Sequence, residues 1–319
     1  MKRHQQILAA VLVVQVLLTA FVFWPRPATT TQGAPVFPDL TTDAVVALTV
    51  TDDQGNSVAL RKVDDGWVLP DADDYPVLAD SVTALLDKLV ALTTDRLVTR
   101  TDTSHSQLQV AADNFVRRVE FETADGTSQV LYIGSAQNYT ATHFRIEGQD
   151  ETYLADGLST YEINATPASW AESAYLQIPN DELTQVALKN ANGVFTFIKT
   201  KDALWTLKEL GSGAELSQSQ VSTFISRVSA LSLLNPLGKE EQPEYGMDEP
   251  LAVVTLKTAD ETVTLTVGAK LSDESGYVVK ASTSPYYVMV AEYAISSVVE
   301  NARADFLEAE PTPAPTTAP

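Results

Sequence analysis

The side chains best able to do chemistry are few and scattered along this sequence. The 319-residue chain has three histidines and no cysteine. His105 and His143 are far apart, and neither His-Glu-x-x-His nor His-x-His spacing occurs. The missing cysteine excludes disulfides, thiolate metal sites and a cysteine nucleophile. We therefore expect no metal-binding residue, and His143 is predicted to occupy a structural position on a strand face.

Motifs for nucleophilic catalysis or phosphate binding are also missing. The sequence contains no Gly-x-Ser-x-Gly elbow and no dinucleotide fingerprint after a strand. Gly211-Ser212-Gly213 lacks the lysine and the length of a phosphate-binding loop. We predict no catalytic residue and no cofactor, and we do not expect the chain to be an enzyme.

Carboxylates are abundant, so some pairs arise by chance. Asp71-Ala72-Asp73-Asp74 alternates like a calcium loop but lacks its sixth-position glycine and closing glutamate, which favours a solvated turn. Glu240-Glu241, Glu244 and Asp248-Glu249 form an acidic run that is most often a solvated loop, although a basic patch on a partner could bind it. Two carboxylates acting as general acid and base remain an alternative, but no spacing selects a pair.

The balance of charge limits the possible partners. The formal net charge is −21, which argues against nucleic acid or an anionic membrane surface because neither would be neutralised. The same charge would favour cationic partners or divalent ions and would keep an exposed protein soluble.

The beginning of the chain resembles a membrane anchor. Ile7 to Trp24 is almost wholly apolar, and its eighteen residues would form a helix about 27 Å long, close to the thickness of a hydrocarbon core. Lys2 and Arg3 predict a cytoplasmic N-terminus, with the bulk of the chain outside the cell. A cleaved signal peptide is the alternative. The expected segments are a cytoplasmic N-terminus (1–6), a transmembrane helix (7–24), a Pro/Thr-rich linker (25–42) and a disordered Pro/Thr/Ala tail (309–319).

Between the linker and the tail, the sequence contains one pattern twice. Trp67 and Trp205 each end a strand-like run, and each precedes an apolar series with the i, i+3, i+4, i+7 spacing of a helix face. The two series are 139 residues apart: Val82, Leu85, Leu86, Leu89, Leu92 and Val221, Phe224, Ile225, Val228, Leu231. Further matches follow at a spacing of 134: Ile133-Gly134 with Val267-Gly268, His143 with Tyr277, and Tyr153 with Tyr287. This repetition predicts two related units, 43–179 and 180–308.

Each unit is predicted to be antiparallel sheet with one main packed helix, which gives an α+β class. Turn signals such as Asp125-Gly126 and Asn192-Gly193 mark hairpins. Predicted strands cover 46–50, 58–63, 67–69, 96–100, 116–122, 129–133, 143–146 and 151–154, then 186–188, 194–200, 204–207, 252–258, 262–267, 277–281 and 286–289.

The first main helix is expected to have Pro76 in its first turn or Asp80 as its cap, and the second to carry a Ser217–Gln220 capping box. Shorter helices are predicted over 158–164 and 295–306. Trp67, Trp170 and Trp205 are expected in the core, with ligand stacking as the alternative.

These features resemble a known family. The Trp after a hairpin, the leucine-rich helix, Tyr245-Gly246-Met247-Asp248-Glu249-Pro250 and the strand pair ending in Val267-Gly268 are similar to the domain-of-unknown-function 4340 family. The resemblance covers most of the chain after the linker. In the first unit, Gln107-Leu108-Gln109 stands where Gly-Met-Asp stands in the second, and no proline follows.

The resemblance implies an N-terminal anchor followed by such units, in auxiliary proteins of ABC-type exporters and gliding-motility-like systems. It implies no catalytic residue. The expected function is therefore that of a non-catalytic, membrane-anchored accessory or interaction protein with protein partners, such as an ABC-type permease and ATPase. The alternative is a cell-envelope enzyme or ligand-binding sensor with a site between the two units.

Overall fold

The computed structural model describes residues 33–308 except 65, 139, 209, 212–213 and 272–274. The predicted cytoplasmic N-terminus (1–6), transmembrane helix (7–24) and tail (309–319) lie outside the described residues. Within the described part of the chain, no helix combines the length and apolarity needed to span a membrane.

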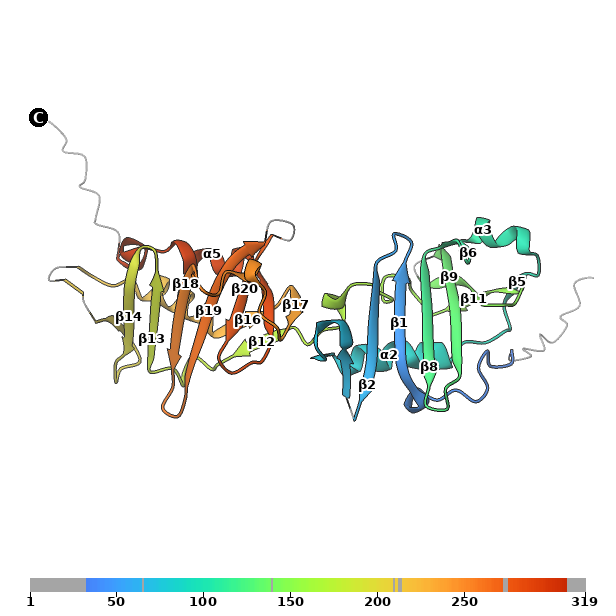
Figure 1. Cartoon of the computed structure of the whole chain (residues 1–319), viewed down its shortest axis with the longest axis horizontal. Helices are drawn as coiled ribbons and strands as arrows, with labels where there is room; N and C mark the ends of the chain where they lie inside the picture. The colour runs from blue at the N-terminus through green and yellow to red at the C-terminus, as the bar shows by residue number, and fades with distance from the viewer. Residues whose placement is uncertain are drawn as a thin grey trace, which may run out of the picture.

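The fold is α+β with antiparallel sheets and few helices, as predicted (Figure 1). The first sheet has nine strands in the order β4-β3-β2-β1-β8-β9-β10-β11-β5. Its strands are β1 (Val45–Asp52), β2 (Ser57–Val63), β3 (Gly66–Leu69), β4 (Tyr75–Pro76), β5 (Leu97–Thr99), β8 (Arg117–Thr123), β9 (Ser128–Asn138), β10 (Ala141–Ile146) and β11 (Thr152–Asp156).

The second sheet repeats this arrangement with eight strands in the order β15-β14-β13-β18-β19-β20-β21-β17. Apart from β4, each strand of the first sheet has a counterpart at the same place in the second. The strands are β13 (Gln185–Asn190), β14 (Gly193–Lys199), β15 (Trp205–Leu207), β17 (Asn235–Gly238), β18 (Ala252–Lys257), β19 (Thr262–Leu271), β20 (Gly276–Ala281) and β21 (Tyr287–Ala291).

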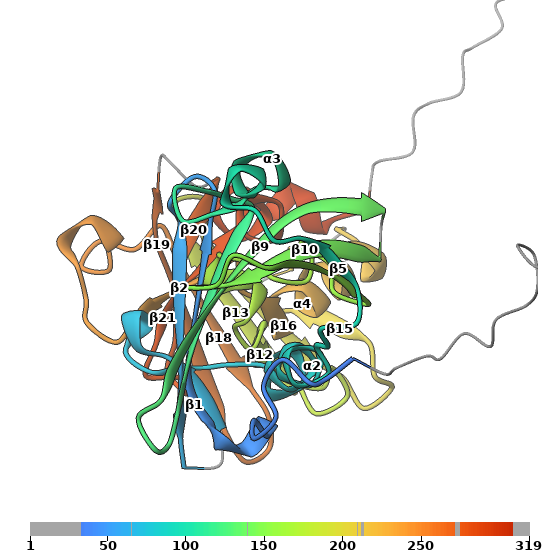
Figure 2. The same cartoon turned by 90° about the vertical axis from the view of Figure 1, so that its right-hand side faces the viewer.

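One twelve-residue helix covers the inner face of each sheet. These are α2 (Ala79–Val90) and α4 (Gln218–Ser229), which begin 139 residues apart as the apolar series predicts. Their buried side chains are Val82, Leu85, Leu86 and Leu89 in α2, and Val221, Phe224, Ile225 and Val228 in α4. Burying each such side chain contributes roughly 1.5–3 kcal/mol, so these two stripes fix the helices on the sheets. Figure 2 shows both helices on the same side of the molecule.

The remaining helical segments are short. They are α3 (His105–Leu108), α5 (Glu292–Glu300), and the 3₁₀ turns η1 (Thr42–Ala44), η2 (Pro70–Ala72), η3 (Asp102–Ser104), η4 (Pro167–Ser169), η5 (Pro243–Tyr245) and η6 (Arg303–Phe306). Two small two-stranded sheets pair β6 (Val110–Ala111) with β7 (Asn114–Phe115), and β12 (Ala174–Gln177) with β16 (Ala230–Ser232). Trp67, Trp170 and Trp205 are all buried, which confirms their predicted place in the core.

Several predicted helix boundaries are wrong. Pro76 lies in β4 rather than in a helix, and α2 begins after Leu78 without a side-chain cap. Ser217 precedes α4 but makes no capping hydrogen bond, so the predicted capping box does not form. The side chain of the next residue, Gln218, instead binds the backbone of Trp205.

The two shorter predicted helices also differ from the structure. No helix covers 158–164. Leu158 and Ile163 are both buried, but in a helix a separation of five residues would place their side chains roughly 140° apart, and both could not face the core. The last helix, α5, ends at Glu300 because the Asn190 side-chain amide binds the carbonyls of Val298 and Asn301. Its predicted continuation to 306 is the separate turn η6.

The strand ladders correct the predicted alignment between the units by one residue. Ile133 pairs with Phe144 in the first sheet, whereas Val267 pairs with Val279 in the second. His143 therefore corresponds to Val278, and Tyr153 to Val288, rather than to Tyr277 and Tyr287. A slip of one residue matters because it moves a side chain to the opposite face of the sheet.

The described ends of the units differ from the sequence-based limits. Val36 donates its N–H to the Leu92 carbonyl (2.8 Å), and Phe37 packs edge-on against Phe121 with ring centroids 5.3 Å apart. The described part of the predicted 25–42 linker is thus packed against the first unit. Likewise, the predicted limits of the first unit (43–179) include 174–177, which form β12 and pair with β16 of the second.

Candidate functional site

The two histidines within the described residues have structural surroundings. His105 begins α3, is nearly buried, and donates from Nε2 to the Asp150 carbonyl (2.9 Å). His143 lies on β10 with Nδ1 at 2.7 Å from the Ser135 carbonyl. Each ring is held by a different backbone carbonyl, so the two do not form one site.

The aspartates of the calcium-like segment also serve separate purposes. Across the described part of the chain, no group of three or more His, Asp or Glu side chains is placed to hold a metal. The Asp73 carboxylate accepts the backbone N–H of Lys239 (2.6 Å), and the Asp74 carboxylate accepts from Arg61 (2.7 Å). The prediction of a solvated turn is therefore incomplete, because Asp73 ties the first unit to the second.

Three tyrosines continue this junction between the units. The rings of Tyr75 and Tyr286 meet edge-on with centroids 4.8 Å apart. The Tyr286 hydroxyl donates to the Asp74 carbonyl (2.7 Å), and the Tyr175 hydroxyl donates to the Tyr286 carbonyl (2.8 Å). The buried apolar side chains of both units form one continuous cluster across it. Sequence reasoning missed these tyrosines because their contacts join residues as much as 212 positions apart.

Burial makes Tyr75 and Tyr175 poor acid–base groups. It raises the pKa of Tyr75 well above the ordinary value, with the negative charge of Glu172 and the neighbouring tyrosines adding to the effect. Burial also raises the pKa of Tyr175. Both hydroxyls donate hydrogen bonds to carbonyls, so both remain neutral and structural.

A short lid covers part of the outer face of each sheet. We define the first lid as residues 102–116 and the second lid as residues 239–250. The first packs against Val130 and Tyr132 of β9. The second packs against Val278 of β20 and Tyr287 of β21.

Both lids contact a glycine of the sheet through one backbone carbonyl. A Cβ on Gly134 would lie 2.1 Å from the Leu108 carbonyl oxygen, and one on Gly268 would lie 2.0 Å from that of Tyr245. The next lid residue is left-handed in both cases, with φ of 55° at Gln109 and 64° at Gly246. Leu108-Gln109-Val110 thus matches Tyr245-Gly246-Met247, which shifts the alignment expected from sequence. The Tyr-Gly-Met segment is a structural clasp, and glycine is required where its carbonyl meets the strand.

The acidic run lies in the second lid and is mostly exposed. Glu241 accepts a hydrogen bond from the Tyr287 hydroxyl (2.7 Å). Burial and, after it, this carboxylate raise the pKa of Tyr287 to about 12. All five acidic residues of the run are exposed, as a solvated loop predicts: Glu240, Glu241, Glu244, Asp248 and Glu249.

One hollow of about 640 Å³ lies between the first described residues and the β8–β9 hairpin. Phe37, Leu40 and Phe121 supply apolar walls, with Asp39 and Asp125 among its polar lining. The Asp125 carboxylate is occupied by the Thr123 hydroxyl (2.6 Å) and the Thr127 N–H (3.0 Å), and these bonds lower its pKa. The hollow could hold an apolar group, but it contains no acid–base pair.

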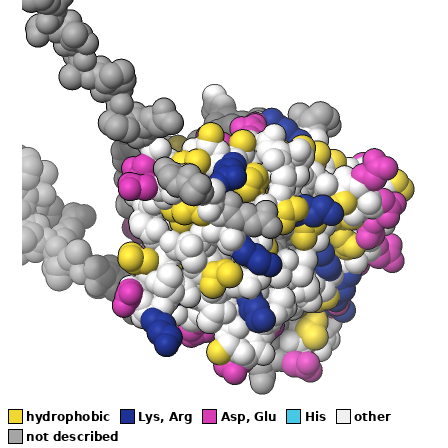
Figure 3. All heavy atoms as spheres, turned by 90° about the vertical axis from the view of Figure 1, so that its left-hand side faces the viewer, with side chains coloured by type: hydrophobic (Ala, Val, Ile, Leu, Met, Phe, Trp, Pro, Cys, Tyr) yellow, Lys and Arg dark blue, Asp and Glu magenta, His cyan; other side chains and the backbone are white. Residues whose placement is uncertain are grey.

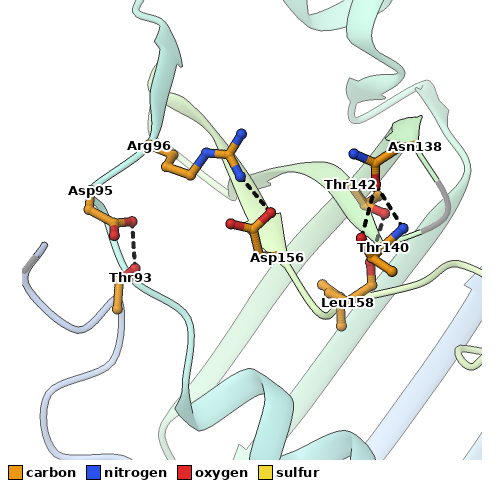
Figure 4. A network of polar contacts seen from close by, with 8 residues as sticks. All are labelled: Thr93, Asp95, Arg96, Asn138, Thr140, Thr142, Asp156 and Leu158. Carbon is orange, nitrogen blue, oxygen red and sulfur yellow. Dashed lines mark hydrogen bonds and ion pairs between the residues drawn. The ribbon is translucent and has the colours of Figure 1, made fainter.

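A second hollow of about 470 Å³ lies beside the end of α2, where the charges are already paired (Figure 4). Arg96 binds Asp156, and Lys88 binds Glu162. Thr93 donates to Asp95 (2.7 Å) in the turn between α2 and β5. These contacts close the edge of the sheet and leave no cation here without an acidic partner.

Comparison with known proteins gives one match. The family model described as "Domain of unknown function (DUF4340)" matches residues 67–250, from the buried Trp67 to the proline that ends the second lid. No curated protein and no solved structure matched the chain. The matched part includes α2, α4, the first-unit side of the junction (Asp73 and Tyr75) and the Tyr-Gly-Met segment of the second lid. On this match, which spans more than half of the sequence, the chain belongs to the DUF4340 family.

Proposed function

We propose that this protein is a non-catalytic accessory subunit of a membrane export complex of the ABC type or of a related gliding-motility-like system. The apolar segment Ile7–Trp24 tethers it, with Lys2 and Arg3 in the cytoplasm and both units outside the cell. Family membership and the apolar segment support this proposal. The association with an ABC-type transporter is what the sequence resemblance implies.

The observation that carries the proposal is the junction between the two units. Asp73, Tyr75 and Tyr286 hold the units together through backbone and ring contacts rather than through a flexible linker. Both sheets turn their outer faces to the same side (Figures 1 and 2). A protein built to hold partners needs such a long, fixed surface.

Co-purification from native membranes tests the proposal. The full-length chain, tagged at its C-terminus, would be solubilised in a mild detergent, and bound proteins would be identified by mass spectrometry. We expect a multi-spanning permease and an ATPase to be recovered with the chain. A matched chain that lacks residues 1–24 should no longer recover the permease and the ATPase, because the anchor holds it beside them. Recovery of the intact chain without any membrane protein would contradict the proposal.

The hollow beside Phe37 favours a second candidate, a ligand-binding sensor. Its volume is within the range of small-molecule sites, and its walls are partly aromatic. Phe37→Ala should then abolish the thermal stabilisation produced by an apolar ligand screened against the full chain. If no ligand shifts the melting temperature of the unaltered protein, this candidate is wrong.

A further inference from the structure

The outer face of the second sheet has a charge unlike the rest of the protein. Its outward positions form three rows across β15, β14, β13, β18 and β19. We call them the open face: Thr206, Ile198, Gln185, Lys257 and Thr262; Thr196, Ala187, Thr255 and Thr264; Val194, Lys189, Val253 and Thr266. None of these thirteen residues is acidic, although the chain has 42 carboxylates and a net charge of −21.

The open face combines this basic character with exposed apolar side chains. Val194 is 65% exposed and Ile198 is 37% exposed, while Leu204 beside them is 53% exposed. The two cations of the open face, Lys189 and Lys257, are both exposed. Figure 3 views the β14–β15 end of the second unit, beside the open face, where dark blue Lys and Arg lie among hydrophobic side chains and most Asp and Glu lie toward the margin.

The second lid places the opposite charge on the same side of the same unit. It covers β19 to β21 next to the open face and projects outward beyond the sheet (Figure 2). Glu240, Glu241, Glu244, Asp248 and Glu249 are exposed on it, and Lys239 is its only cation. One side of the second unit therefore has a basic, apolar half beside an acidic half.

Such a surface is complementary to itself under a two-fold rotation. We propose that a second copy of this chain docks on the open face, so that the acidic lid of each copy lies against the lysines of the other. An isologous contact of this kind closes at two copies, because each surface is used once.

The area of the face also favours this arrangement. Five strands spaced about 4.8 Å apart and five residues long cover roughly 400 Å², about half of the roughly 800 Å² per partner of a stable interface. A two-fold pair uses the area of the open face and the area of the lid on each copy, which together come closer to that value. The exposed Val194 and Ile198 of β14 would be covered by the partner copy.

The first unit offers no comparable surface. The positions equivalent to Val253, Thr255 and Lys257 are Arg118, Glu120 and Glu122. Arg118 and Glu120 are already paired with each other at 2.8 Å. The mixed and satisfied charges of this face do not complement the acidic lid, so docking is specific to the second unit.

Charge reversal tests the proposal in the full-length chain, purified in a non-ionic detergent. Light scattering would measure the mass of the protein part over a range of concentrations. The unaltered chain should reach twice the mass of one copy. Lys189→Glu with Lys257→Glu should give only single copies, and so should Glu244→Lys with Glu249→Lys. These four side chains are exposed, and circular dichroism would check that each variant is folded.

Mixing the two variants gives the decisive result. In a mixed pair, the new glutamates on the open face of one variant lie against the new lysines on the lid of the other. The unaltered lysines and the unaltered acidic lid meet in the other half of the interface, so the double mass should return. Glu122→Lys in the first unit is the matched control and should leave the double mass unchanged. A single-copy mass for the unaltered chain at every concentration would overturn the proposal, as would a pair that survives either reversal or a mixture that stays single.

Discussion

The two units of this protein share their cores but not their edges. Both have the same twelve-residue helix and the same strand order, yet the first sheet has one more strand. In the first unit, β4 pairs with β3 at the edge of the sheet, and the Val77 N–H donates to the Trp67 carbonyl (2.9 Å). In the second, the Gln218 side chain accepts from the Trp205 N–H and donates to the Trp205 carbonyl, both at 2.8 Å. A side-chain amide thus replaces part of a strand.

The outer faces differ in the same way. The first carries the Arg118–Glu120 ion pair and a buried Arg145 whose guanidinium stacks over Tyr132 at 4.7 Å. The equivalent positions of the second are threonines, valine and lysine. Packing against the helix constrains the inner face of each copy, whereas water tolerates many side chains on the outer face. Differences in function between the units are therefore to be sought outside their common core.

The largest expected effect comes from the shared core. Trp67→Ala and Trp205→Ala should each lower the free energy of unfolding by about 3–5 kcal/mol, because both truncate a buried ring beside the helix. Chemical denaturation followed by circular dichroism measures the change. Similar losses support the equivalence of the two positions. An unchanged transition for Trp205→Ala would show that this residue does not belong to the core.

The clasps of the two lids should give the next largest effect. Gly134→Ala and Gly268→Ala should each destabilise the protein by about 3 kcal/mol, since the new methyl group would meet a backbone carbonyl that can move only with its lid. Hydrogen exchange of the amides in 102–116 and 239–250 would report the displacement. Gly66→Ala is the control, because its nearest neighbour would be 3.9 Å away. Equal exchange in Gly66→Ala and Gly268→Ala would exclude a clasp.

Helical periodicity explains why α2 and α4 could be predicted so closely. Val82, Leu85, Leu86 and Leu89 mark one face of a 3.6-residue period, and each has a counterpart 139 residues later. Hairpin strands were also placed well, although Asn190 pairs with Gly193, so that the turn itself is Ala191-Asn192. Local signals fixed these elements because local geometry determines them.

Register and docking could not be predicted in the same way. All of β21 and nearly all of β20 are buried, because the second lid covers the face that would otherwise be polar. Without an alternating pattern, nothing in the sequence shows which face Tyr287 occupies, hence the slip of one residue. The contact of Tyr75 with Tyr286 depends on how two units meet, which no local pattern encodes.

Gln218 offers a smaller test of how the edges diverged. Gln218→Ala should destabilise the protein by about 1–2 kcal/mol, because the partly buried peptide groups of Trp205 would lose both partners. The equivalent residue of α2 is Ala79, where β3 is already paired with a strand. Ala79→Gln should therefore change the free energy of unfolding by less than about 0.5 kcal/mol. If urea denaturation shows equal effects at the two positions, the amide does not replace a strand.

The smallest effect concerns Gln109 of the first lid, whose left-handed backbone conformation favours glycine over any residue with a side chain. Gln109 is left-handed with φ of 55°, a conformation that costs a non-glycine residue about 1 kcal/mol, while Gly246 holds the same place in the second lid at 64°. Gln109→Gly should therefore stabilise the protein by up to about 1 kcal/mol, and Gly246→Gln should destabilise it by about 1–2 kcal/mol. Thermal denaturation of both variants measures these opposite signs. A loss of stability in Gln109→Gly would mean that the Gln109 side chain contributes more than its backbone costs, and that the two lids are held by different interactions.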